Sequence, residues 1–348
     1  MDISFISSLA VSEATRRSIS RSQEALVQAQ QSLASGRKAD IGLALGANTG
    51  RLVSLRSDID QLDTLIGGNK ISSGRLEATQ STLETVASIG QDFFNTLLAV
   101  DHSNTGPGVA VQSARAGLAA FTSTLNTTFN GEYVLAGINT ANQPVNDYFA
   151  AGSANKAAVD TAFFAHFGFA QNDPLVATLT DTDIGAFIDG AYDTLFDAAN
   201  WSANWSTASS TNITAKISAS QSVEVSSNAN LDPIRQIAKA FTMVADLGGD
   251  ALSEGAFDEV VSRARDMVGN ALAVLNTERG RIGIAQQNIA DASDRMEIQV
   301  KLLTTTVADI EGVDTFEVST KINTLLTQIE VSYALTSRVQ RLSILNHL

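Results

Sequence analysis

The sequence predicts a mainly α-helical protein, a long antiparallel helical bundle or coiled-coil rod with an inserted mixed α/β middle domain. Three observations predict this fold. A heptad row of apolar residues extends over positions 257–310, matching rows occur in the first third of the chain, and the composition changes between residues 145 and 229. We therefore expect the N- and C-terminal parts to form the rod together.

The row at 257–310 is the strongest pattern in the chain. Its apolar residues recur at alternating steps of four and three, and no proline interrupts it. A helix with a sustained 3.5-residue period buries such a stripe only against partner helices of similar length. The row consists of Phe257, Val261, Ala264, Val268, Ala271, Leu275, Ile282, Ala285, Ile289, Ala292, Met296, Leu303 and Ile310.

Two earlier rows are candidates for these partners. Residues 50–100 are predicted as one long helix, although each interior glycine in it costs about 1 kcal/mol relative to alanine. The row at 111–129 follows a strong turn at residues 104–108, so this helix should pack antiparallel beside the helix at 50–100. A further helix is expected after Asp232 and Pro233, with Asp232 as its N-cap residue.

Both chain ends carry shorter helical rows. In the N-terminal row, apolar residues repeat every seven positions from Ile19, and Gly36 suits the helix end. A last helix is expected from about Thr315, after Gly312. Its apolar residues cover an arc that the segment 19–34 cannot cover alone, so we predict an interface between subunits; an intramolecular core is the alternative. The predicted interface residues are Ile19, Leu26, Leu33, Val318, Ile322, Leu325, Leu326, Ile329, Tyr333, Leu335, Val339, Leu342 and Leu345.

The segment 145–229 reads as a separate middle domain. An aromatic cluster at 163–169 is expected in its core, and the row at 184–196 suits one face of a short helix. Alternating residues at 213–225 predict a strand pair with one buried face. The predicted division is a terminal coiled coil (1–42 and 312–348), a helical rod domain (43–144 and 230–311) and a solvent-facing outer domain (145–229).

Composition excludes several classes of function. The net charge of −14 without a basic stripe argues against nucleic-acid binding, and the lack of cysteine excludes disulfides and thiol catalysis. His102, His166 and His347 follow no metal-ligand spacing, so no metal or other cofactor is expected. No apolar run is long enough to span a membrane, and the N-terminus lacks the build of a cleaved secretory signal.

Four stretches resemble the flagellin family of bacterial flagella. Residues 26–37 resemble the N-terminal helix and turn of that family, and 279–289 resemble its arginine–glycine–glutamine–asparagine signature through Arg279, Gly280, Gln287 and Asn288. The stretch 130–137, with Asn130, Gly131 and Gly137, and the leucine-rich ending at 342–348 are more similar to the members that join hook to filament. After Arg37, the single acid Asp40 departs from the family's usual pattern, which places the contacts of that turn in doubt.

The resemblance implies a structural flagellar subunit at the hook–filament junction rather than an enzyme. Such a subunit is made in the cytoplasm, exported unfolded through the flagellar channel, and assembled by its terminal helices into a ring or helical layer. Its implied partners are copies of itself, flagellin, another hook-associated protein and an export chaperone that binds the C-terminus, with no nucleic acid and no membrane insertion.

Three other functions remain open from the sequence. The chain could be filament flagellin itself, or a secreted coiled-coil effector of an injection machine. It could also be a glycan or peptide hydrolase, because carboxylates in the middle domain could flank a sugar as an acid pair; the alternative for these carboxylates is the solvated face of a short helix. They are Asp181, Asp183, Asp189, Asp193 and Asp197.

Overall fold

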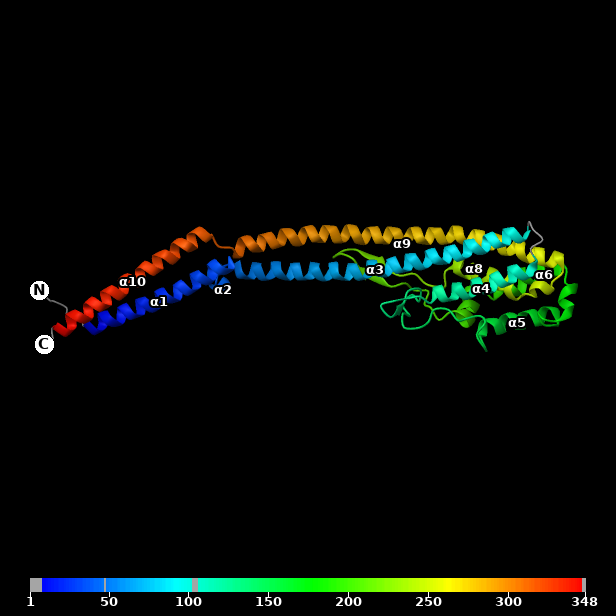
Figure 1. Cartoon of the computed structure of the whole chain (residues 1–348), viewed down its shortest axis with the longest axis horizontal. Coiled ribbons are helices and arrows are strands. Elements are labelled where there is room, and N and C mark those ends of the chain that lie inside the picture. The colour runs from blue at the N-terminus through cyan, green and yellow to red at the C-terminus, as the bar shows by residue number, and fades with distance from the viewer. Residues whose placement is uncertain (1–7, 47, 102–105, 346–348) are drawn as a thin grey trace. The chain divides into compact units, whose positions relative to one another are not determined.

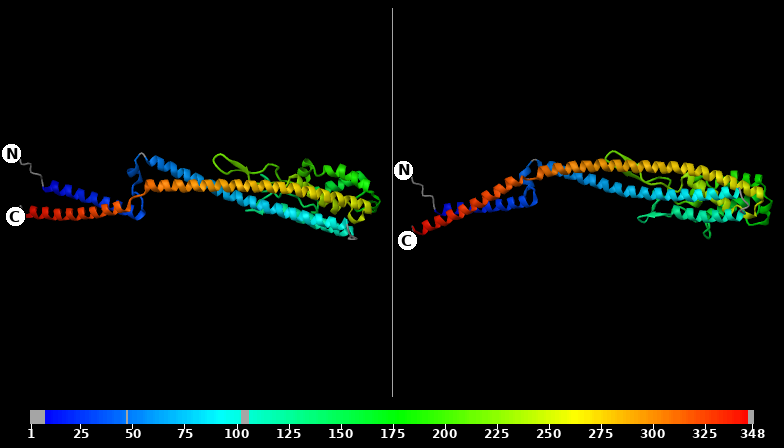
Figure 2. Two further views of the ribbon diagram at one scale, coloured as in Figure 1. Left: turned by 90° about the horizontal axis from the view of Figure 1, so that it is seen from above. Right: turned by 45° about the horizontal axis from the view of Figure 1, so that its top comes forward.

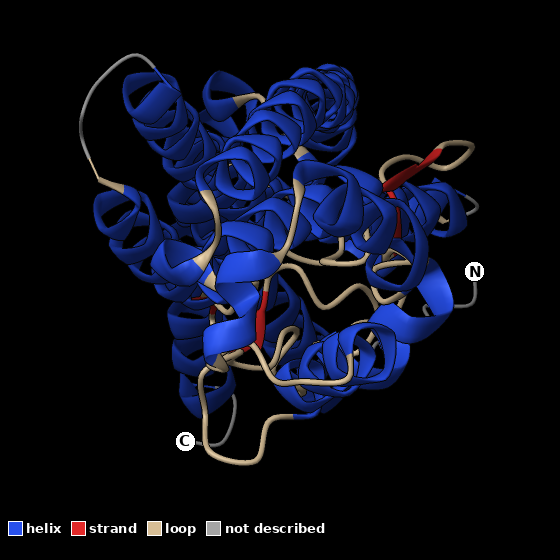
Figure 3. Cartoon of the chain, turned by 90° about the vertical axis from the view of Figure 1, so that its right-hand side faces the viewer, coloured by secondary structure: helices blue, strands red, loops and turns tan. Residues whose placement is uncertain are grey.

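The computed structural model describes residues 8–46, 48–101 and 106–345 (Figure 1). The chain is mainly helical, as predicted, and Figure 3 shows strands only as short pieces among the helices. By their internal contacts the residues form two compact units. The first comprises Met1–Thr64 and Met296–Leu348, and the second comprises Leu65–Arg295.

The first unit is built around a pair of terminal helices, α1 (Ser8–Ser35) and α10 (Thr315–Leu345). They lie side by side and antiparallel, as Figures 1 and 2 show. The unit also contains α2 (Ile41–Leu45), the first part of α3 (Asn48–Asp101) and the last part of α9 (Glu254–Glu311). Helix α1 begins well before Ile19, where the sequence pattern begins, because α10 offers a partner along this additional length.

In the second unit, α3 and α9 run antiparallel, and their contacts advance in opposite directions along the two helices. Asn69 Nδ2 donates to Ser293 Oγ at 3.0 Å, and Arg279 Nη2 lies 3.6 Å from Glu84 Oε2. The row predicted at 257–310 lies on α9, and its members up to Met296 are buried. The predicted single helix at 50–100 is also confirmed as α3.

The centre of the second unit is an aromatic contact between three helices. Phe241 of α8 (Asp232–Asp246) stacks on Phe93 of α3 with ring centroids 4.2 Å apart, and lies 5.9 Å from Phe121 of α4 (Pro107–Leu125). The prediction of Asp232 as N-cap was wrong, since Leu231 occupies that position. Asp232 lies in the first turn, where its negative charge interacts favourably with the helix dipole.

The segment between α4 and α8 folds into short elements of the second unit. Its helices are α5 (Ala154–Phe167), η1 (Pro174–Thr178), α6 (Asp181–Phe187), η2 (Ile188–Tyr192), α7 (Ala198–Asn200) and η3 (Trp201–Trp205), and η4 (Gly249–Ala251) follows α8. Its strands form two antiparallel hairpins, β1 (Thr128–Phe129) with β2 (Glu132–Tyr133) and β3 (Thr214–Lys216) with β4 (Ser222–Glu224).

Two predictions for this segment are confirmed in outline. The strand pair exists, with Ile217 fully buried beyond β3. In the aromatic stretch, Phe163, Phe167 and Phe169 pack together, while Phe164 is 58% exposed and lies outside the cluster. Many buried side chains of this segment belong to the same hydrophobic core as those of α3, α4, α8 and α9.

We predict that Gly117→Ala destabilises the second unit. A Cβ at Gly117 would lie 2.9 Å from Phe241 Cζ and closer still to Cε1, and Phe241 cannot move because it is fully buried between Phe93 and Phe121. Overpacking of this kind costs about 1–3 kcal/mol, which urea unfolding would measure.

Gly280→Ala is the matched control, because nothing lies within 4 Å of a Cβ at that position in α9. This variant should gain up to about 1 kcal/mol from helix propensity. Equal stability of the two variants would contradict the close approach of α4 to Phe241.

Candidate assembly surface

A buried carboxylate joins three segments of the first unit. Glu311, the last residue of α9, is paired with Arg56 of α3, and its Oε2 lies 3.6 Å from Nη1 of Arg37, just after α1. The Glu311 side chain is 1% exposed, whereas both arginines reach solvent. The Glu311 carboxylate therefore links the end of α9 to α3 and to the residue that follows α1; we call this contact the joint.

Backbone hydrogen bonds reinforce the same joint. The N–H of Lys38 donates to the carbonyl of Glu311 at 2.9 Å, and the N–H of Val313 donates to the carbonyl of Gly36 at 3.2 Å. Lys38 Nζ also donates to the carbonyl of Ile310 at 2.9 Å, which satisfies an acceptor at the helix end. The sequence analysis missed Glu311, because a lone acid before Gly312 reads as an ordinary helix end.

The side of α10 that faces α1 follows a heptad. Going along α10, the more covered side chains recur at steps of four and three. They belong to Val318, Ile322, Leu325, Ile329, Ser332 and Thr336. On α1, the buried positions include small residues, which allow the two backbones to approach closely. These positions are Ile19, Ser22, Ala29 and Ser32.

The predicted interface residues therefore divide into two groups. Six lie in the contact between α1 and α10 within the chain: Ile19, Leu26, Val318, Ile322, Leu325 and Ile329. Four are exposed at 37–52%: Leu33, Leu326, Tyr333 and Leu335. The side chains of Val339, Leu342 and Leu345 lie outside the described residues. The role of these thirteen residues between subunits remains a prediction.

The exposed apolar side chains of α10 do not share one face. Leu326 and Tyr333 are seven residues apart and lie on one side, whereas Val331 and Leu335 project in other directions around the helix. Phe316 in the first turn is 81% exposed. Exposed large apolar side chains of this kind mark contact sites for other molecules, and α1 covers only one side of α10.

Three residues of the stretch 130–137 are explained by the backbone of the second unit. Asn130 and Gly131 have φ angles of 52° and 82°, as the two-residue turn of the β1–β2 hairpin requires. Gly137 has a φ of 60°, and a Cβ there would lie 2.6 Å from the carbonyl oxygen of Thr211. Only glycine fits where the backbone at Gly137 passes the backbone at Thr211. These three motif residues are therefore required by local backbone conformation.

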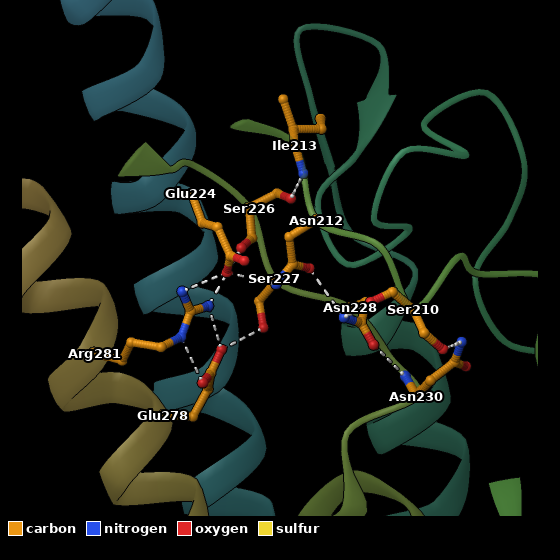
Figure 4. A network of polar contacts seen from close by, with 10 residues as sticks. All are labelled: Ser210, Asn212, Ile213, Glu224, Ser226, Ser227, Asn228, Asn230, Glu278 and Arg281. Atoms are coloured by element: carbon orange, nitrogen blue, oxygen red, sulfur yellow. Dashed lines mark hydrogen bonds and ion pairs between the residues drawn. The ribbon is translucent and has the colours of Figure 1, made fainter. Parts of the chain in front are cut away.

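The stretch 279–289 anchors the segment after β4 to α9, as Figure 4 shows. Arg281 donates from Nη1 to Glu224 Oε2 at 2.9 Å and from Nη2 to Glu278 Oε1 at 2.7 Å, and Ser227 Oγ donates to the same Glu278 atom at 2.7 Å. Glu278 interrupts the apolar row because it faces the polar segment at Ser227.

The charge of Glu278 is favoured by this network. Burial alone would raise the pKa of Glu278, but the hydrogen bonds from Arg281 and Ser227 outweigh burial and hold the pKa below its usual value. Other members of the motif face solvent: Gly280 and Gln287 are exposed, and Gln287 Nε2 donates to Asp291 Oδ1 at 2.6 Å. Asn288 is half-buried.

The five carboxylates of the middle segment have local structural partners. Asp183 forms a capping box with Thr180, whose hydrogen bonds lower the pKa of Asp183, and Asp197 caps α7. Two others pair with bases, Asp189 with Arg263 and Asp193 with Lys239. Asp181 Oδ1 accepts the backbone N–H of Thr182 at 2.8 Å.

Two other kinds of site are absent from the described part of the chain. There, no group of three or more His, Asp or Glu side chains is placed to hold a metal ion. No helix of the described residues is both long and apolar enough to cross a membrane.

Comparison with known families now identifies the two halves of this arrangement. Residues 6–140 match the model of the bacterial flagellin N-terminal helical region, and residues 265–348 match that of the C-terminal helical region. The chain belongs to the flagellin family. It is therefore a structural subunit of the bacterial flagellum and a flagellar component that is exported from the cell.

A solved structure supports the fold independently. It is that of a Vibrio parahaemolyticus protein described as a flagellar hook-associated protein, with a TM-score of 0.51 at 10% sequence identity. The alignment covers 76% of this chain and 97% of the other. No curated protein matches the sequence.

We predict that Glu311→Gln destabilises the contact between the end of α9 and the residues that follow α1. The substitution removes the charge from the hydrogen bond with Arg56, a kind of bond that contributes about 1.5–3 kcal/mol, and from the ion pair with Arg37. We expect the low end of this range because both arginines are exposed. Hydrogen exchange should become roughly tenfold faster at residues 36–45. Glu297→Gln, an exposed position on α9, is the control; equal exchange in both variants would argue against the joint.

A second prediction concerns pH and the Glu278 network. Because the pKa of Glu278 is lowered in the folded state, its stabilising effect is complete above the unfolded value near 4.5 and is lost as the pH falls through the folded pKa. Glu278→Gln should therefore reduce the free energy of unfolding at pH 7 and have a smaller effect near pH 3. Urea titrations of both proteins at the two pH values test this, with exposed Glu77→Gln as control.

Proposed function

We propose that this flagellin-family chain joins hook to filament and assembles into the flagellum through α1 and α10. The carrying observation is α10, which exposes large apolar side chains on more than one side, while α1 packs against another side. Burying Leu326, Val331 and Leu335 together requires neighbours on more than one side, as in a ring or helical layer and unlike a closed pair.

The distribution of charge supports a first unit that packs against other copies and a second unit that faces solvent. The first unit contains 11 basic and 13 acidic residues, whereas the second contains 12 basic and 24 acidic residues, so the second unit holds −12 of the net −14. Tight packing of many copies suits the nearly neutral unit. Strong like charge favours exposure to solvent, so the acidic unit would face outward.

The junction role is favoured over filament flagellin by two features. The stretch 130–137 and the chain ending resemble the members that join hook to filament, and the solved Vibrio parahaemolyticus protein is described as hook-associated. The partners of such a junction would be flagellin on one side and another hook-associated protein on the other. A chaperone that covers α10 before export would protect its exposed apolar side chains.

A strain that lacks this protein tests the junction role. We expect the cells to build hooks and to release flagellin into the medium, because filament subunits would have no layer on which to assemble. Electron microscopy and immunoblots of the medium measure the two effects. Cells that keep a normal filament would contradict the junction role, and cells that lack flagellin altogether would point to the filament subunit.

A further inference from the structure

One flank of the α1–α10 pair is hollowed. Two hollows, of about 430 and 410 Å³, meet at Ala25 and form a continuous groove beside α1. The α1 side of this groove combines longer side chains with small ones, among them Ala14, Ser18, Ala25 and Ser32. A second helix with large side chains can approach closely at the small ones, because little side-chain volume separates the two backbones there.

The side of the pair away from this groove carries a ridge. It is formed by Leu326 and Tyr333 of α10 and Val27 of α1, which are 42%, 52% and 51% exposed. Gln23 Nε2 donates to Tyr333 Oη at 3.0 Å, which places Tyr333 beside the α1 face that carries Val27 four residues later. Leu326 is five residues from groove-lining Lys321, hence about 140° away around the helix.

One part of the groove is opposite in charge to the ridge. Arg17 and Arg21 are the charged residues that line the first hollow, whereas Glu330 stands between Leu326 and Tyr333 on α10. The second hollow carries both signs, with Lys38 and Lys321 beside Asp40, Asp314 and Glu317. Among the described residues, Arg21 and Glu330 form no ion pair, and Arg17 has one with Glu13 at 3.7 Å. The ridge and the hollow lined by Arg17 and Arg21 are thus complementary in charge, although they belong to the same pair of helices.

We infer that the ridge of one copy seats in the groove of a second copy, with Glu330 against Arg17 and Arg21. This contact rests on the proposed assembly through α1 and α10, and it specifies how neighbours meet. A groove-to-groove pair would bring arginines together, and a ridge-to-ridge pair would bring Glu330 beside Glu330 and leave both grooves empty. The contact is therefore heterologous, and repetition of it generates a ring or a helical layer.

Cysteine pairs test the contact directly, because the chain contains no cysteine of its own. Cells would co-express Ser18→Cys, in the groove, with a size-tagged Leu326→Cys, on the ridge, and isolated flagella would be oxidised. We expect a disulfide between the untagged Ser18→Cys form and the tagged Leu326→Cys form, and none when either variant is expressed alone. Ala25→Cys with Tyr333→Cys is the second pair. Groove-to-groove or ridge-to-ridge dimers, or no product from either pair, would overturn the inference.

Charge reversal and groove filling give independent readouts in the full chain. Glu330→Arg and Arg21→Glu should each reduce the amount of protein in sheared flagella at least tenfold, and the double variant should recover it. Ser18→Leu should fill the groove and have the same effect, while Ser57→Leu, at an exposed position of α3 that lines neither hollow, should not.

The outcomes separate this inference from the proposed function. Wild-type protein absent from flagella would refute assembly itself. Wild-type protein present, with Ser18→Leu and both charge variants incorporated normally, would refute only the seating of ridge in groove. Circular dichroism of each purified variant would show whether the helices remain folded.

Discussion

The structure depends on one constraint, the burial of a very long apolar stripe. Helix α9 presents such a stripe over most of its length, and a lone helix cannot bury it. Within the second unit the stripe belongs to one hydrophobic core together with buried side chains of α3, α4 and α8. Where the covering segment is polar, a charged residue replaces an apolar one in the stripe. Glu278 is the example, and it accepts hydrogen bonds from Ser227 and Arg281.

Close packing in the second unit also explains two positions where only glycine is tolerated. Gly117 lies against Phe241, and Gly137 lies against the backbone carbonyls of Ser209 and Thr211. Both glycines allow an approach that an added Cβ would prevent. In contrast, Gly280 has nothing near its Cβ position, so its presence in the middle of α9 has no explanation within the chain.

In the first unit the constraint is only partly satisfied. Helix α1 covers one side of α10 and leaves apolar side chains on the others, while the joint at Glu311 fixes where α1 and α10 begin relative to the end of α9. The joint holds the α1–α10 pair at the end of α9, and the pair leaves apolar side chains exposed. This arrangement suits a subunit whose exposed apolar side chains are buried by neighbouring copies. The low net charge of this unit removes one obstacle to such packing.

The sequence alone determined the long helices and the family. Periods of 3.5 residues without proline specified α3 and α9, glycines marked the ends of α1 and α9, and four short motifs indicated flagellin ancestry, because these signals depend only on local spacing. Tertiary structure decided what spacing cannot encode. Leu325 and Leu326 are adjacent and equally apolar, yet α1 covers Leu325 and leaves Leu326 exposed, since orientation around a helix depends on its partner. For the same reason the sequence does not mark Glu311 as special. Its role is visible only in the folded chain, where Arg37 and Arg56 lie beside its carboxylate.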